Sequence, residues 1–425
     1  MQKTILIVDD NQLYRQAVKR NLLLRNYAVI EAENAGDAIA KLEKKTPQVI
    51  VTDLDMRTRT EGLDLIKELH QKRPEIPIIL ISAVGTFDEG ALAKEFRAMY
   101  VISKSRVGNE IENLFQLIES AIAHQEKEMK ILTQLDEWKD NVDQVPTDTV
   151  LPRLRDIIND DTYSGLVKSE AFDILYTYSV PTLTAETKTT LQQVQQQVPV
   201  ALPQQVEKDI DLVLAKYPEL QDESKENIRT AEFLYRYQTD FDTGYDFTRS
   251  IGFSYCFAVE NETKHKFRFK LLKFLRSATT RELLQKIYDF RLKNIDLFFQ
   301  QYIMRLQQSK SLDFQVDKIK LIFEKMMQHG ERYKPDGLKA MGIIIFCFGR
   351  EYQAPTTHGP MDVYNPLGLK GLAYEEEVLQ LAHELIKLQH FRNPYIHPEI
   401  TARQKVTIIR ESALKCLDYV CKLQE

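Results

Sequence analysis

Groups that could carry out phosphoryl chemistry follow four short apolar runs in the first 104 residues. The runs 4–8, 49–52, 76–81 and 100–103 lead into Asp9-Asp10, Asp53, Ser82 and Lys104. Clustered carboxylates suit Mg²⁺, which keeps several waters and can bridge to a phosphate. A metal-supported carboxylate can act as a nucleophile and become an aspartyl phosphate. A hydroxyl and an ammonium group can bind the phosphoryl oxygens.

Parallel strands are the elements that would bring these groups together. The apolar runs are rich in β-branched residues and alternate with helix-like segments, as in sheets with helical crossovers. In such sheets the residues at the carboxyl ends of the strands face one crevice. We therefore predict a doubly wound α/β fold with a five-stranded parallel sheet over residues 1–122. Taken singly, Asp9-Asp10 could cap the next helix, and Asp53 could belong to a turn.

In order, strand context and spacing, these residues resemble the flavodoxin-like receiver domain of two-component response regulators. The resemblance implies that Asp53 is the phosphoacceptor and that Ser82 and Lys104 contact the phosphoryl group. The Mg²⁺ ligands it implies are Asp9 (through water), Asp10, Asp53 and the backbone carbonyl of Asp55. The implied phosphodonor partner is a sensor histidine kinase or a phosphotransfer protein.

The sequence departs from the usual receiver pattern next to Lys104 and after Asp53. Ser105 stands where the family usually has a proline, and Val101 stands where it has an aromatic residue, with Tyr100 one place earlier. The loop after Asp53 looks about one residue longer than usual. We expect the acceptor chemistry to follow the family and the relay of phosphorylation to differ from it.

Length and composition limit the classes that the whole chain fits. With 425 residues, it is long enough for about three domains. A net charge of −5 argues against a generally basic nucleic-acid-binding surface, and DNA is not an expected partner. Four cysteines without CxxC or zinc spacing, a strand that begins after three residues and no apolar run near 18 residues predict a cytoplasmic protein without a membrane span.

The rest of the chain reads as helical. We predict a helical connector over 123–215 and an all-α output domain over 216–425. Helices are expected within the second region at 225–237, 246–278, 279–310 (with a break left open), 315–330, 372–392 and 401–424. The Gly- and Pro-rich segment 349–371 is expected to be a long loop, which in a compact domain is usually functional or mobile.

A second constellation lies near the end of the chain. Arg392 falls on the same helical face as Val378 and Leu385, so it should point inward, where an unpaired charge is costly. Asn393-Pro394 is expected to end or restart the helix, with the proline at its first position. Glu260 lies on an apolar stripe. It could pair with Lys264 at i, i+4 spacing, or it could face a shared polar pocket.

Arg392, Asn393 and His397 form an Arg-Asn-x-x-x-His pattern that resembles the HEPN superfamily, whose signature is Arg-x4–6-His. The resemblance implies a metal-independent endoribonuclease, often dimeric, or a non-catalytic binding or scaffolding module. In the first case His397 would act as general acid/base and Arg392 as phosphate clamp, with Asn393 and Glu260 as further site residues. RNA and a second copy of the chain are then the expected partners, and no cofactor is expected in this domain.

Overall fold

The computed structural model describes thirteen stretches of the chain. They are residues 2–54, 56, 61–72, 76–82, 100–103, 111–160, 162–197, 203–240, 246–289, 294–312, 314–372, 375–396 and 404–424. These residues form two compact units. One unit, called here the α/β unit, comprises Met1–Gln134 and Asp289–Asn294, and the other, the helical unit, comprises Leu135–Tyr288 and Ile295–Glu425.

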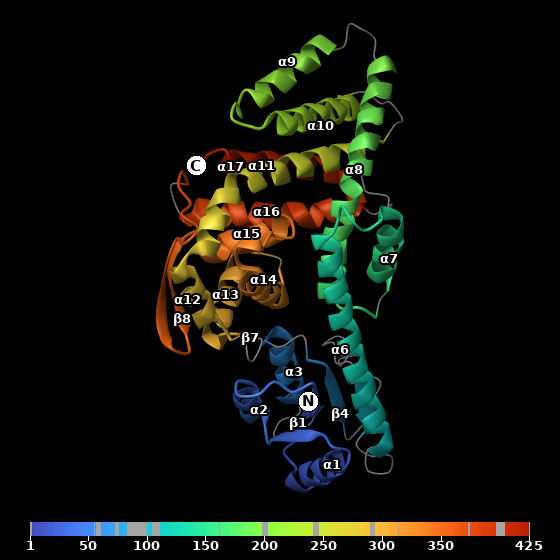
Figure 1. Cartoon of the computed structure of the whole chain (residues 1–425), viewed down its shortest axis with the longest axis vertical. Coiled ribbons are helices and arrows are strands. Elements are labelled where there is room, and N and C mark those ends of the chain that lie inside the picture. The colour runs from blue at the N-terminus through green and yellow to red at the C-terminus, as the bar shows by residue number, and fades with distance from the viewer. Residues whose placement is uncertain are drawn as a thin grey trace. The chain divides into compact units, whose positions relative to one another are not determined.

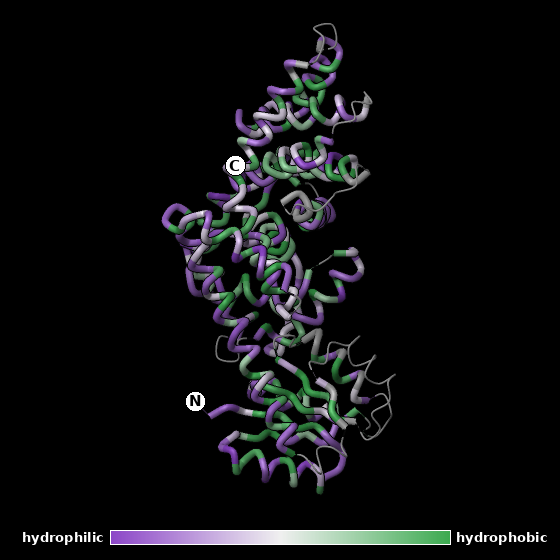
Figure 2. Tube along the Cα trace, turned by 90° about the vertical axis from the view of Figure 1, so that its right-hand side faces the viewer, coloured by the Kyte–Doolittle hydropathy of each residue, from purple (hydrophilic) through white to green (hydrophobic). Residues whose placement is uncertain are grey.

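The α/β unit contains the predicted five-stranded parallel sheet, with the strand order β2-β1-β3-β4-β5 (Figure 1). Its strands are β1 (Thr4–Val8), β2 (Ala28–Ala32), β3 (Val49–Asp53), β4 (Ile78–Ser82) and β5 (Tyr100–Ser103). Every residue of β1 and β3 is buried, as expected for central strands covered on both faces. Figure 2 shows several stretches of the trace near the N-terminus coloured hydrophobic.

Helices cover both faces of the sheet. Helices α1 (Gln12–Leu24) and α6 (Ile111–Asp140) pack on one face, where Val18 and Ile118 share a buried cluster with Ile5. Helices α2 (Ala35–Leu42) and α3 (Glu61–Lys72) pack on the other, where Leu65 lies in one cluster with Leu6. The doubly wound fold predicted from the sequence is therefore confirmed.

The helical unit holds one large apolar core that extends from Val194 to Leu423. Its first helices are α7 (Thr147–Asn159), α8 (Gly165–Gln197), α9 (Pro203–Leu214), α10 (Asp222–Asp240) and α11 (Thr248–Arg276). They are followed by α12 (Ala278–Ile287), α13 (Leu297–Ser309), α14 (Val316–His329), α15 (Leu338–Phe348), α16 (Glu375–Ile396) and α17 (Gln404–Val420). Two short strands, β6 (Tyr288–Asp289) and β7 (Asn294–Ile295), separate α12 from α13, so the break left open within 279–310 is present.

The segment 349–371 is not the loop that its prolines suggested. It forms an antiparallel hairpin of β8 (Glu351–Thr356) and β9 (Gly359–Tyr364), in which Pro355 lies opposite Pro360. A two-stranded sheet has only edge strands, where a proline without an N–H donor can be accommodated. Gly359 supplies the positive φ of +101° at the turn.

One expectation about a helix end was wrong. Asn393-Pro394 does not end or restart a helix, because α16 continues to Ile396. A proline removes one backbone N–H, and in the last turn of a helix that loss affects only one bond. In the predicted connector, α8 is a 33-residue helix that contains Pro181. The division into a connector (123–215) and an output domain (216–425) stays a prediction.

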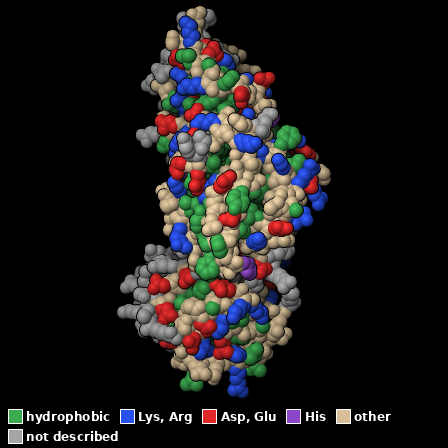
Figure 3. All heavy atoms as spheres, turned by 90° about the vertical axis from the view of Figure 1, so that its left-hand side faces the viewer, with side chains coloured by type: hydrophobic (Ala, Val, Ile, Leu, Met, Phe, Trp, Pro, Cys, Tyr) green, Lys and Arg blue, Asp and Glu red, His purple; other side chains and the backbone are tan. Residues whose placement is uncertain are grey.

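Charged side chains of both signs are distributed over the surface. On the face drawn in Figure 3, acidic and basic side chains are interspersed, with apolar side chains between them. Within the described stretches, no helix combines the length and the apolar character needed to cross a membrane.

Candidate functional site

Three aspartates meet at the carboxyl edge of the sheet. Asp9 and Asp10 follow β1, and Asp53 ends β3. Each offers a carboxylate oxygen, and these three oxygens lie within 4.8 Å of one another. Asp9 and Asp53 are each 1% exposed, while Asp10 is exposed. This acidic cluster is therefore a half-open site with two buried carboxylates and one at the surface.

Strand register explains why the three carboxylates converge. Val8 pairs with Thr52, the residue before Asp53, so β1 and β3 end at the same level of the sheet. Next to them, Asp53 pairs with Ile81. The backbone of Ser82 lies at the end of β4, the strand next to β3.

A local hydrogen bond orients Asp9. The backbone N–H of Asn11 donates to Asp9 Oδ1 at 2.8 Å, and the Asn11 side chain caps α1 by accepting from Leu13 and Tyr14. Burial, and then the charges of Asp9 and Asp53, raise the pKa of Tyr14. Asp9 and Asp53 thus disfavour a second negative charge on the neighbouring phenol.

The start of α3 lies very close to the backbone at the end of β3, next to Asp53. Gly62 donates its N–H to the carbonyl of Leu54 at 3.2 Å. A Cβ at this position would lie 2.3 Å from the carbonyl oxygen of Asp53, a distance that side chains do not tolerate. Glycine is therefore required where α3 begins beside the end of β3.

Oxygen ligands in this arrangement fit Mg²⁺. The ion prefers carboxylates and water, and a half-open cluster leaves coordination positions for water or a phosphate oxygen. The cluster of Asp9, Asp10 and Asp53 is typical of a Mg²⁺ site. The backbone carbonyl of Asp55 and the residue Lys104 lie outside the described residues, as does the side chain of Ser82. Their predicted roles therefore stay predictions.

The second predicted constellation is centred on Arg392, which points inward as expected and is 1% exposed. Its Nη1 donates to Glu260 Oε2 at 2.8 Å and its Nη2 to Asp173 Oδ1 at 3.1 Å. The guanidinium carbon also lies 3.9 Å from the ring centroid of Tyr176. Burial opposes the positive charge, but Glu260 and Asp173 raise the pKa of Arg392 above its usual value.

Glu260 fulfils both interpretations that the sequence left open. Lys264 Nζ lies 2.6 Å from Glu260 Oε1, and Arg392 binds the other carboxylate oxygen. Burial disfavours the charged carboxylate, but Lys264 and Arg392 outweigh it and lower the pKa of Glu260. The helical pair and the shared polar pocket therefore coexist at one residue.

Arg392 is part of a larger buried ion network that the sequence analysis did not identify. Lys318 of α14 pairs with Glu170 and with Asp173 of α8, the latter at 3.3 Å. Lys325 lies 3.1 Å from Glu170 and 3.2 Å from Asp336. The remaining members of the network are Asp136 and Lys139 of α6, which pair with Lys325 and Asp336.

A sequence signal for this network existed. Lys318 and Lys325 stand seven residues apart, with Ile322 between them at the i+4 position, so both lysines fall on the apolar face of α14. The same reasoning that placed Arg392 inward would have placed these lysines inward. Gly337, with a φ of +104°, lets its loop approach the network, since a Cβ there would lie 3.0 Å from Gln389 Oε1.

The predicted catalytic set is only partly described. Arg392 and Glu260 are brought together, whereas His397 and the side chain of Asn393 lie outside the described residues. Several basic side chains of α11 are ion-paired. Lys266 pairs with Glu219 at 3.5 Å and Arg276 with Glu331 at 2.8 Å, in addition to the pair of Lys264.

Residues 5–119 match the family model described as the response regulator receiver domain. The DNA-binding transcriptional regulator NtrC of Salmonella typhimurium is 29% identical over 131 residues, which are 31% of this chain and 27% of that protein. The alkaline phosphatase synthesis transcriptional regulatory protein PhoP of Bacillus subtilis is 30% identical over 132 residues, covering 31% of this chain and 55% of that protein. The chain thus spans about a quarter to a half of these relatives.

Among solved structures, a CheY-like response regulator receiver domain protein from Methanospirillum hungatei is 26% identical, covering 30% of this chain and 99% of that one, with a TM-score of 0.28. The family match concerns the α/β unit. The HEPN identity predicted for the helical region is not shown by these similarities.

Proposed function

We propose that this chain, whose residues 5–119 form a response regulator receiver domain, is a signalling protein switched by phosphorylation of Asp53. The observation that supports this role is the convergence of three carboxylates within 4.8 Å at the carboxyl edge of the sheet. Mg²⁺ held by Asp9, Asp10 and Asp53, with the carbonyl of Asp55, would neutralise charge on the phosphoryl group.

The chemistry follows from this geometry. A carboxylate oxygen of Asp53 attacks the phosphorus of the donor, and the bond to the leaving group breaks as the aspartyl phosphate forms. Ser82 and Lys104 would receive the phosphoryl oxygens by a hydrogen bond and by charge. The donor would be a sensor histidine kinase or a phosphotransfer protein, and the site of action the cytoplasm.

Phosphorylation with acetyl phosphate tests this proposal. The full-length protein with Mg²⁺ should gain one phosphoryl group by intact mass, and Asp53→Asn should gain none. Asp64→Asn, which changes an exposed aspartate on α3 of the same domain, is the matched control and should behave like the wild type. Phosphate gained by Asp53→Asn would refute the assignment of the acceptor.

For the helical region, we propose a non-catalytic interaction module whose association with a partner depends on the receiver. The observation in favour is that Arg392 is 1% exposed and bound by two carboxylates, which leaves its charge neutralised within the protein. A phosphate clamp needs a guanidinium whose charge is available to the ligand. Light scattering before and after phosphorylation would show whether the partner is a second copy of the chain.

A metal-independent endoribonuclease is the second candidate, and the observation that favours it is the cavity that Arg392 lines. His397 would act as general acid/base, with Arg392, Asn393 and Glu260 beside it. Incubation of single-stranded RNA with the phosphorylated and unphosphorylated protein tests this candidate. RNA cleavage by the wild type that is lost in His397→Ala would establish the endoribonuclease. Equal RNA cleavage, or none, by the two proteins would favour the interaction module instead.

A further inference from the structure

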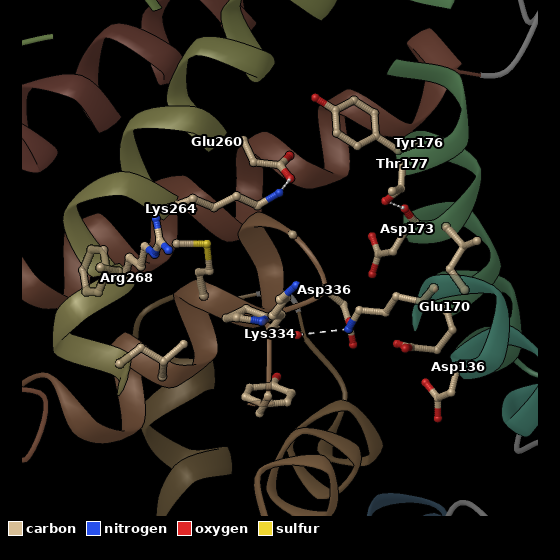
Figure 4. A pocket seen from close by; sticks show the side chains of 18 of the residues that line it. Asp136, Glu170, Asp173, Tyr176, Thr177, Glu260, Lys264, Arg268, Lys334 and Asp336 are labelled. Carbon is tan, nitrogen blue, oxygen red and sulfur yellow. Dashed lines mark hydrogen bonds and ion pairs between the residues drawn. The ribbon is translucent and has the colours of Figure 1, made fainter. Parts of the chain in front are cut away.

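A cavity of about 630 Å³ lies beside the buried ion network in the helical unit (Figure 4). Its volume falls in the range of about 300–1,000 Å³ that is usual for small-molecule sites. One wall is apolar and comes mainly from α11. The apolar residues that line it include Phe267, Leu271, Leu272, Leu275 and Met341. A cavity with such a wall can bury the apolar part of a ligand.

Positive charges are in excess at the rim of the cavity. The carboxylates that line it all have cationic partners; they are Asp136, Glu170, Asp173, Glu260, Glu331 and Asp336. Arg268 and Lys334 also line the cavity and are exposed, and among the described residues neither has an ion pair. The rim therefore presents two uncompensated positive charges next to an apolar wall.

The arrangement of the side chains separates Arg268 from most of the acidic groups, whereas Lys334 lies near Asp336. In Figure 4, Lys264 and Arg268 extend from α11 on one side of the cavity, and Asp136, Glu170 and Asp173 lie on the opposite side. An anion beside Arg268 would therefore be held away from most of the carboxylates.

Tyr333 borders the cavity without exposing its hydroxyl to it. Tyr333 lines the cavity and is 5% exposed, and its Oη has no hydrogen-bond partner among the described residues. Because this hydroxyl is itself buried, a ligand in the cavity would not contact it, and the apolar wall and the rim charges are the features that would hold a ligand.

We propose that this cavity binds a small anionic amphiphile. Its apolar body packs against the α11 wall, and its anionic head lies at Arg268 and Lys334. The charges and the apolar wall of the cavity together favour this class of ligand. An uncharged apolar molecule would make no ion pair with Arg268 and Lys334, and a cationic ligand would be repelled by them. The site is separate from Asp53 and does not depend on the proposed phosphorylation.

Two related fluorescent probes test the proposal on the full-length protein. 8-Anilinonaphthalene-1-sulfonate carries an anionic head on an apolar ring system, and N-phenyl-1-naphthylamine has the same rings without the charge. The anionic probe should bind one per chain and more tightly than the neutral one. Decanoate below its micellar concentration should displace it, and Asp53→Asn should bind it as the wild type does.

Variants locate the binding. Arg268→Gln and Lys334→Gln should each weaken the anionic probe about threefold to fivefold, as expected for exposed charges, and leave the neutral probe unchanged. Lys273→Gln removes an exposed charge of α11 outside the cavity and is the matched control. Leu272→Trp should weaken both probes by filling the cavity.

Several results would overturn the proposal. They are equal affinities for the two probes, several probes bound per chain, and an unchanged affinity in the Arg268→Gln/Lys334→Gln double variant. Cosedimentation with phosphatidylglycerol vesicles, without displacement of the probe by decanoate, would point to a membrane surface instead. Displacement by single-stranded RNA alone would point to a nucleic acid.

Discussion

Arg392 links two carboxylates that come from distant parts of the chain. Its partners Glu260 and Asp173 precede it by 132 and 219 residues, so one guanidinium ties α16 to α11 and α8. A buried ion pair adds little net stability by itself, but removing one partner leaves an uncompensated buried charge. The position should therefore tolerate substitution poorly, whatever the function of the helical region.

Arg392→Met should lower the free energy of unfolding by about 3–5 kcal/mol, because Glu260 and Asp173 would lose a shared cation. Urea unfolding followed by circular dichroism measures the change. Arg281→Met on α12 is the matched control, since Arg281 is exposed, and should change stability by less than about 0.5 kcal/mol. Equal unfolding curves for the two variants would contradict the structural role.

The titration of Glu170 should contribute to the pH dependence of the free energy of unfolding. Burial opposes its ionisation, but Lys318 and Lys325 outweigh burial and lower its pKa from 4.5 to about 2. A carboxylate with a lowered pKa contributes stability above about pH 4.5 and loses it as the pH falls towards about 2. Glu170→Gln lacks this titration, so the difference in unfolding free energy between wild type and variant should shrink over that interval. A difference that does not vary with pH would show that Glu170 is not held ionised.

At the scale of elements, the acidic cluster was predictable because its information is local. Each of Asp9, Asp10 and Asp53 closely follows an apolar run, and parallel strands place their carboxyl ends together. The pairing of Arg392 was not predictable in this way. The sequence placed it on a buried face, but its partner Asp173 depends on long-range packing that no local pattern encodes.

The errors in the elements have physical causes as well. The strands β8 and β9 were missed because Pro355 and Pro360 suggested a loop. The two prolines lie opposite each other in a two-stranded sheet, where both strands are edge strands and can accommodate a residue without an N–H donor. Helix α15 was missed because nearly all of its residues are buried, and a continuous apolar run does not show helical periodicity.

Helix α15 packs closely on α16 through Gly342. A Cβ at this position would lie 2.9 Å from the backbone oxygen of Ala382 and 2.8 Å from Ile386 Cγ1. Backbone cannot yield as a flexible side chain can, so Gly342→Ala should destabilise the protein by about 1–3 kcal/mol despite the better helix propensity of alanine. Thermal unfolding by circular dichroism measures this effect.

Gly165→Ala provides the comparison for that experiment. Gly165 begins α8 in the same unit, and a Cβ there would meet only the Gln315 side chain at 3.5 Å, an ordinary contact. This variant should keep or slightly raise the unfolding temperature. If Gly342→Ala behaves in the same way, the close approach of α15 and α16 is not a constraint on the fold.

At the scale of the whole molecule, the two compact units have separate apolar cores. The buried clusters of the sheet involve residues up to Ile122, whereas the core of the helical unit begins at Val194. We expect calorimetry of the full-length protein to resolve two transitions, of which one belongs to each unit.

Mg²⁺ should shift only the transition of the receiver. Three carboxylates within 4.8 Å repel one another, and a cation that binds the folded state relieves this repulsion. At about ten times its Kd, Mg²⁺ should add about 1.4 kcal/mol to the stability of that unit. Asp53→Asn removes one negative charge, so this variant should be more stable than wild type without Mg²⁺ and should respond less to it. A shift of both transitions, or an undiminished response of Asp53→Asn, would contradict a metal site confined to Asp9, Asp10 and Asp53.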